Sequence, residues 1–122
     1  MVAEVRTNVP LRYMRVAPAT LTAERLERLR KADAVVRRIS AASGWDSRVW
    51  QFPVITIPFG SPDLPDSVVL RPVQSVDGMT AEAVELDRET LEFMAADLFR
   101  VGGICAVFLD LTHKPPGTIE WE

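Results

Sequence analysis

The sequence predicts an α+β domain in which a small sheet of about four strands packs with two helices, in the order β-α-β-β-α-β. Two segments with a helical apolar period begin at polar capping residues, and short runs rich in β-branched and aromatic residues lie around them. The chain of 122 residues has no internal repeat and no linker long enough to divide it. We therefore expect a single domain over residues 1–122, with residues 1–10 as an N-terminal arm.

A short strand and a long helix follow the arm. Residues Leu11–Val16 (LRYMRV) alternate in polarity and stop before Pro18, which is typical of a strand at a sheet edge. Helix signals then start at Thr22, a suitable N-cap, and end at Gly44. The apolar stripe of this helix consists of Leu26, Leu29, Val36 and Ile39. The spacing of Glu24–Arg28 and Glu27–Lys31 predicts two i,i+4 ion pairs.

The middle of the chain predicts two paired strands. The segment 48–59 (RVWQFPVITIPF) is apolar on both faces despite its two prolines. After the loop GSPDLPD, the segment 67–76 (SVVLRPVQSV) predicts its antiparallel partner.

A second helix and a last strand complete the order. The helix begins after Asp87 as cap, ends before two glycines, and is expected to turn Leu91, Met94, Ala95 and Leu98 inward. The strand Ile104–Leu111 is nearly continuous apolar sequence, so both of its faces need cover. Two helices shield one face of such a sheet. We therefore expect the other face to associate with a second copy, in preference to being covered by loops or by the tail.

Composition excludes several classes of function. The formal net charge of −3 gives no basic footprint for nucleic acid or for an anionic membrane. No apolar run approaches the length of a membrane span, and the N-terminus lacks the apolar core of a signal peptide. A single cysteine, Cys105, excludes an internal disulfide and favours a reducing compartment. We expect a cytoplasmic protein with no nucleic-acid or membrane partner.

The sequence holds no complete catalytic or metal-binding set. Its one histidine, His113, lies in a loop without an assignable carboxylate partner. Its one cysteine lies inside an apolar strand with no basic neighbour, which indicates a buried, inert thiol. Phosphate-binding glycine loops, dinucleotide fingerprints and serine elbows are absent from the sequence. We predict no catalytic residue and no metal site.

Four stretches resemble the C-terminal domain of GMP synthase. These are the strand Leu70–Val73 (LRPV), the turn Asp77–Ala81 (DGMTA), the tail Lys114–Glu122 (KPPGTIEWE) and, in the first helix, Arg30–Val36 (RKADAVV). The resemblance extends from about Leu11 to the end of the chain. It implies the small dimerisation domain that follows a glutaminase domain and an ATP-pyrophosphatase domain in that family.

The resemblance also implies a role. The family enzyme makes GMP from xanthosine monophosphate (XMP), ATP and glutamine, and its C-terminal domain forms the homodimer and completes the XMP site. The family residues that contact XMP fall here on Gln51, Lys114, Ile119 and Glu120. A lysine and a carboxamide suit a phosphate, and Pro115 and Pro116 fix the backbone that carries the lysine. We expect no cofactor in this domain, because ATP and Mg²⁺ would belong to the pyrophosphatase domain, whose motifs this sequence lacks.

Two positions depart from the family. Asp97 and Ala106 stand where the family has arginines directed at the phosphate, so we expect weak XMP binding, with Arg100 as a nearby replacement charge. Two functions follow. The chain is either a dimerisation and XMP-binding module, acting in cis or with a separate ATP-pyrophosphatase subunit, or a free-standing homodimer that has lost XMP binding and acts as a structural or regulatory partner. A start at Met1 favours a chain that exists by itself. In either case we expect the isolated chain to be inactive.

Overall fold

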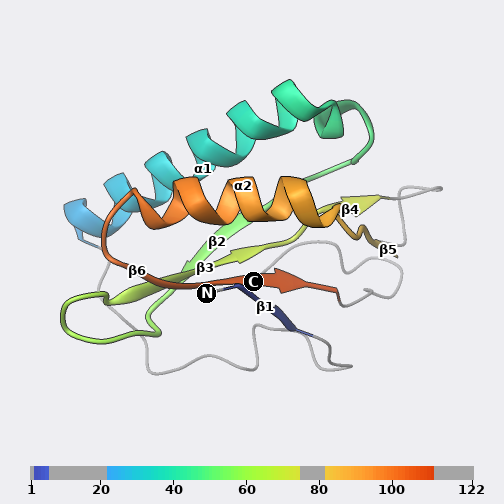
Figure 1. Ribbon diagram of the computed structural model, residues 1–122. Coiled ribbons are helices and arrows are strands. Elements are labelled where there is room, and N and C mark those ends of the chain that lie inside the picture. Colours follow the sequence, from blue (N-terminus) through green and yellow to red (C-terminus); the bar gives the residue numbers. More distant parts are fainter. Residues whose placement is uncertain (1, 6–21, 75–81, 112–122) are drawn as a thin grey trace.

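The computed structural model describes residues 2–5, 22–74 and 82–111, in which two helices lie on one face of a mixed sheet (Figure 1). The helices are α1 (Ala23–Ser43) and α2 (Arg88–Phe99). The sheet has the order β1-β6-β3-β2, built from β1 (Val2–Val5), β2 (Val54–Ile57), β3 (Asp66–Leu70) and β6 (Ile104–Asp110). A two-stranded ribbon of β4 (Val73–Gln74) and β5 (Glu82–Ala83) and the short 3-10 helix η2 (Trp45–Ser47) complete the described elements. The predicted α+β class is confirmed.

Both predicted helix starts carry the expected caps. The Thr22 hydroxyl accepts a hydrogen bond from the Arg25 N–H at 3.1 Å, and the Asp87 carboxylate accepts one from the Thr90 N–H at 3.1 Å. At the end of α1, Gly44 adopts the left-handed conformation, with φ +84°. These local signals place both helices within one or two residues of their predicted bounds.

The predicted ion pairs Glu24–Arg28 and Glu27–Lys31 do not form, and one member of each, Arg28 and Glu27, has another partner. Arg28 Nη1 lies 2.5 Å from the Asp66 carboxylate at the start of β3. Glu27 lies 3.9 Å from Arg30, at i,i+3 spacing. A buried carboxylate attracts an arginine more strongly than an exposed glutamate does, since less water screens the charges.

The strands differ from prediction at the start of the chain and in the middle. Residues 2–5, inside the stretch expected to be an arm, form β1, which pairs in parallel with β6. The predicted strand Leu11–Val16 lies outside the described residues. β2 and β3 are antiparallel as predicted, but the expected strand 67–76 divides into β3 and β4 around Arg71 and Pro72. Proline lacks the N–H that a continuous ladder needs at that point.

The core lies between the helices and the sheet. Its buried apolar side chains come from α1, α2, β3 and β6: Ala32, Val36, Met94, Leu98, Val68, Leu70, Val107 and Leu109. Ala95 is also buried, and Leu91 packs against this core while remaining partly exposed. The inward face predicted for α2 is therefore confirmed.

The sheet face opposite the helices, here called the outer sheet face, is also apolar. Because side chains alternate along a strand and Val54, Val68 and Leu70 belong to the core, their neighbours Ile55 and Val69 point to the outer sheet face. Ile55, Val69 and Phe108 stand side by side in the registers of β2, β3 and β6. Phe59 packs edge-on against Phe108 with ring centroids 6.0 Å apart and is 48% exposed. The predicted second apolar face is present.

Candidate functional site

Gln51 is the predicted XMP-contacting residue that lies within the described chain. Its N–H donates to the carbonyl oxygen of Val73 at 3.2 Å, and the Val73 N–H donates back to Gln51 at 2.9 Å. The bridge holds the Gln51 backbone, and the residue itself is exposed to solvent. Gln51 is therefore anchored with its side chain available to a ligand.

Gln51 lies at the edge of the sheet where the three parallel strands end. β1, β6 and β3 run in the same direction, and the register pairs Leu70 with Leu109 at their carboxyl ends. One residue further on, the Arg71 N–H donates to the carbonyl oxygen of Pro53, two residues after Gln51. We call this region the carboxyl edge. Lys114, Ile119 and Glu120 lie outside the described residues, in the segment that follows this end of β6.

A buried ion pair occupies the carboxyl edge. Arg71 Nη1 lies 2.6 Å from Asp110 Oδ2, and each side chain is 1% exposed. Arg71 belongs to the LRPV stretch that resembles the family, but no role was predicted for it or for Asp110. The sequence did contain a signal for this pair, because each of the two apolar segments VVLRPV and ICAVFLDL includes one charged residue.

The two departures from the family pattern lie away from Gln51. α2 begins beside the β4–β5 ribbon, to which Gln51 is bridged through Val73, and it ends beside the start of β6 (Figure 1). Asp97 follows Arg88 by nine residues, which corresponds to about 13 Å along a helix axis. Ala106 is completely buried within β6. In one copy of the chain, Asp97 and Gln51 therefore lie at opposite ends of α2.

Asp97 is neutralised by neighbours and is not a bare negative charge. Arg38 Nη2 on α1 lies 2.6 Å from one carboxylate oxygen, and Arg100 Nη1 lies 3.0 Å from the other. The hydrogen bond from Arg38 lowers the pKa of Asp97 below its ordinary value, and the charges of Arg38 and Arg100 act in the same direction. Asp97 supplies no cation to a phosphate, and weak XMP binding stays a prediction. Arg100 is paired with Asp97 while its side chain stays 80% exposed, and its role as a replacement charge stays a prediction.

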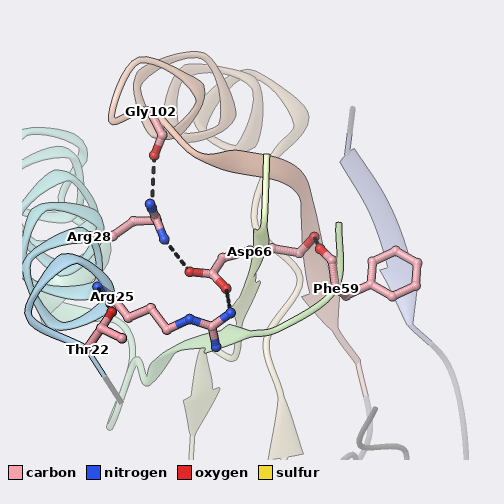
Figure 2. A network of polar contacts seen from close by, with 7 residues as sticks. Thr22, Arg25, Arg28, Phe59, Asp66 and Gly102 are labelled. Carbon is pink, nitrogen blue, oxygen red and sulfur yellow. Dashed lines mark hydrogen bonds and ion pairs between the residues drawn. The ribbon is translucent and has the colours of Figure 1, made fainter. Parts of the chain in front are cut away.

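A second buried carboxylate lies at the opposite edge of the same strands. Asp66, 1% exposed, begins β3 and receives Arg25 at 3.1 Å and Arg28 at 2.5 Å, both reaching from the first turns of α1 (Figure 2). Arg28 Nε also donates to the carbonyl oxygen of Gly102 at 3.1 Å. The network joins α1, β3 and the α2–β6 loop. Because both arginines are engaged, we assign it a structural role.

A shallow depression beside this network is remote from Gln51. It is lined by Ala23, Glu24, Glu27, Arg28, Lys31, Val101 and Gly102. Its mixture of charges selects no particular ligand, so the depression does not define a site.

The described residues add little further chemistry. Within ranges 2–5, 22–74 and 82–111, no group of three or more His, Cys, Asp or Glu side chains is placed to hold a metal ion. Among these residues there is also no helix both long and apolar enough to cross a membrane. Cys105 is partly exposed and not fully buried as expected, and His113 lies outside the described residues.

The described residues thus define a two-layer α+β domain that carries a charged cluster at each end of its parallel strands and no assembled catalytic set. Residues 37–121 match the family described as the GMP synthase C terminal domain. The chain belongs to this family.

Curated relatives agree with this assignment. The chain is 40% identical over 94 residues to a probable glutamine-hydrolyzing GMP synthase of Leptospira interrogans, a match that covers 77% of this chain and 16% of the relative. It is 40% identical over 116 residues to the glutamine-hydrolyzing GMP synthase of Nocardia farcinica and 41% identical to that of Leifsonia xyli. These two matches cover 84% of this chain and 21% and 22% of the relatives. The chain therefore spans about a fifth of the length of these relatives.

Proposed function

We propose that this chain serves as the dimerisation and XMP-binding domain of a glutamine-hydrolysing GMP synthase, a cytoplasmic ligase of purine nucleotide biosynthesis. The observation that carries the proposal is the family match over residues 37–121. Glutamine hydrolysis and ATP activation belong to other domains, which act in the same chain or as a separate ATP-pyrophosphatase subunit. ATP and Mg²⁺ bind there, and this domain binds no cofactor of its own.

The XMP contacts assemble at the carboxyl edge. Gln51 offers an exposed carboxamide there, and Lys114 follows Asp110 by four residues, a reach of at most about 14 Å. The lysine supplies a charge for the phosphate and the carboxamide a neutral donor, while Ile119 and Glu120 contact the nucleotide from the tail. Affinity is weak, in the millimolar range, because among Gln51, Lys114, Ile119 and Glu120 the lysine alone offers a positive charge to the phosphate, and Asp97 and Ala106 add none where the family has arginines.

The homodimer forms through the outer sheet face. Val69 at the centre of this face is buried and Ile55 and Phe108 are half-buried, so the open apolar surface on this face is concentrated at Phe59, which is 48% exposed. An interface that buries about 1,200–2,000 Å² in total is typical of a stable pair of this kind. A two-fold axis would bring the same patch of both copies together.

Phe59→Glu tests the dimer. Full burial of a Phe side chain is worth about 1.5–3 kcal/mol. Phe59 keeps about half of that surface exposed and occurs twice in the pair, so the dissociation constant should rise at least about 10-fold. Phe93→Glu is the matched control, because Phe93 is 61% exposed on α2 and so lies away from the outer sheet face. Sedimentation equilibrium measures both.

Three results would decide the proposal. A monomer at tens of micromolar, or a dimer broken by Phe93→Glu and not by Phe59→Glu, contradicts the interface. Glutamine hydrolysis or ATP-dependent pyrophosphate release by the isolated chain contradicts the absence of chemistry in this domain. An intact dimer that binds no XMP supports the alternative role as a structural or regulatory partner.

A further inference from the structure

One arginine, Arg48, forms no ion pair with a carboxylate of the described residues. The other arginines of ranges 22–74 and 82–111 each pair with an aspartate or a glutamate: Arg25, Arg28, Arg30, Arg37, Arg38, Arg71, Arg88 and Arg100. Arg48 is exposed to solvent and stands three residues before Gln51. The segment that carries the predicted ligand contact therefore also carries a cation whose charge is not used within this part of the fold.

An aromatic ring holds the Arg48 guanidinium in place. Its Cζ lies 4.0 Å from the centroid of the Trp45 ring. That ring is fixed, because Trp45 is only 7% exposed and its Nε1–H donates to the Asp87 carboxylate at 2.9 Å. A guanidinium stacked by its face on a ring keeps the N–H groups at its edge available to an acceptor. The cation is thus ordered before any ligand arrives.

Backbone hydrogen bonds join Arg48 to Gln51. In residues 48–51, the first two N–H groups donate to the carbonyl oxygen of Trp45, at 2.9 and 3.1 Å. The last two donate to the carbonyl oxygen of Val73, at 2.9 and 3.2 Å. Because no N–H of this segment is left unbonded, the positions of its residues are fixed relative to one another. The Cα atoms of Arg48 and Gln51 lie at most about 11 Å apart.

Two aspartates belong to the elements around this stack, and neither pairs with Arg48. The two oxygens of Asp87 accept N–H groups of Trp45 and Thr90, at 2.9 and 3.1 Å, so this carboxylate is occupied as the cap of α2. Asp46 in η2 is exposed and forms no ion pair with a described residue. A fixed and unpaired guanidinium suits an anion with two oxygens side by side, such as a phosphate.

We propose that Arg48 is a phosphate-binding residue of this domain and that it binds the phosphomonoester of XMP beside Gln51. Two N–H groups of the guanidinium donate to two phosphate oxygens, while the Gln51 carboxamide contacts the same nucleotide. Arg48 then restores one of the positive charges missing at Asp97 and Ala106. The inference rests on the proposed function for the identity of the nucleotide, whereas inorganic phosphate tests the cation by itself.

The test titrates XMP and, separately, inorganic phosphate into the unmodified chain and into Arg48→Gln, at constant pH and ionic strength. NMR follows the Gln51 amide and the Trp45 indole N–H. Arg48→Gln should raise the dissociation constant of XMP at least about fivefold, because a charge-assisted contact is lost. Arg48→Lys keeps the charge but not the planar fork, so it should bind XMP more tightly than Arg48→Gln.

Arg30→Gln is the matched control. Arg30 is also exposed, at 68%, and its contact with Glu27 is long, at 3.9 Å. It precedes the last residue of α1 by thirteen positions, which corresponds to about 20 Å along the helix axis. XMP should bind this variant as it binds the unmodified chain. Circular dichroism checks that all the variants are folded.

The outcomes separate this inference from the proposed function. If XMP binds the unmodified chain, a rise of less than fivefold in Arg48→Gln, or an equal rise in Arg30→Gln, overturns the role of Arg48 and leaves the proposed function standing. If XMP does not bind, shifts caused by inorganic phosphate that disappear in Arg48→Gln support the cation site and refute the proposed XMP-binding function. Binding of neither probe by the unmodified chain overturns both.

Discussion

Replacing Asp66 by asparagine removes the charge that holds the start of α1 against β3 (Figure 2). Removing one partner of a buried ion pair typically costs about 3–5 kcal/mol, because the remaining charge loses both water and its partner. Here the arginines are still 25% and 15% exposed, so water compensates part of the loss. We expect Asp66→Asn to lower the free energy of unfolding by about 2–4 kcal/mol.

Urea unfolding followed by circular dichroism measures this loss, at one protein concentration because a dimer's stability depends on it. Glu92→Gln is the control, since the Arg88–Glu92 pair has side chains 91% and 67% exposed. An exposed pair of this kind is worth at most about 1 kcal/mol. A loss for Asp66→Asn no larger than that of the control would refute the structural role of the network.

The network itself is tested by a double-mutant cycle. Arg28→Met alone removes the 2.5 Å contact with Asp66 and the bond to Gly102. Combined with Asp66→Asn, it should show a coupling energy of at least about 1 kcal/mol. Additive losses would mean that the two residues do not interact in solution.

Two further predictions concern the α2–β6 loop and α2 itself. Gly102→Ala and Gly103→Ala both place a side chain at positive φ (+95° and +75°), but a Cβ on Gly103 would also lie 2.5 Å from Arg28 Nε. Thermal unfolding should show that Gly103→Ala costs about 1 kcal/mol more than Gly102→Ala, and equal costs would contradict the close approach. The pKa of Asp97 is lowered from its ordinary value of 3.8, so its ionised carboxylate stabilises the folded state at pH values above 3.8. This stabilisation is lost as the pH falls through the lowered pKa. Asp97→Asn should therefore lower the free energy of unfolding less and less as the pH falls from about 6 to about 2. A loss that stays constant over this range would contradict the pair with Arg38.

Local signals in the sequence predicted the helices well. Thr22, Asp87 and Gly44 cap the helices through contacts within one turn, so the residues next to them in the sequence are enough to predict where each helix begins or ends. β1 was not predicted, because VAEV is short and gains its strand character by pairing with β6, about a hundred positions further along. Pairing between distant segments is set by tertiary packing, which a local pattern does not report.

The same distinction holds for the charged residues. Arg28 had a suitable glutamate four residues away, yet it pairs with Asp66 because that carboxylate is buried. Asp97 was noted as a departure from the family's arginine, and the structure adds that Arg38 from α1 neutralises it across 59 positions. Gln51 was predicted from the resemblance to the family, and the structure adds that its backbone is held at the edge where β6 ends. For these residues the sequence predicted the kind of side chain at each position, and the fold was needed to show which distant residues surround it.

Titration of XMP into isotope-labelled protein, followed by amide NMR, tests the central claim most directly. If this domain completes an XMP site at the carboxyl edge, the amide signals of Gln51, Lys114, Ile119 and Glu120 should shift together with a millimolar dissociation constant. The shifts should disappear in Lys114→Ala. No shift up to about 10 mM XMP, where a millimolar site would be largely occupied, would contradict the claim. So would shifts confined to the end of α2 around Asp97.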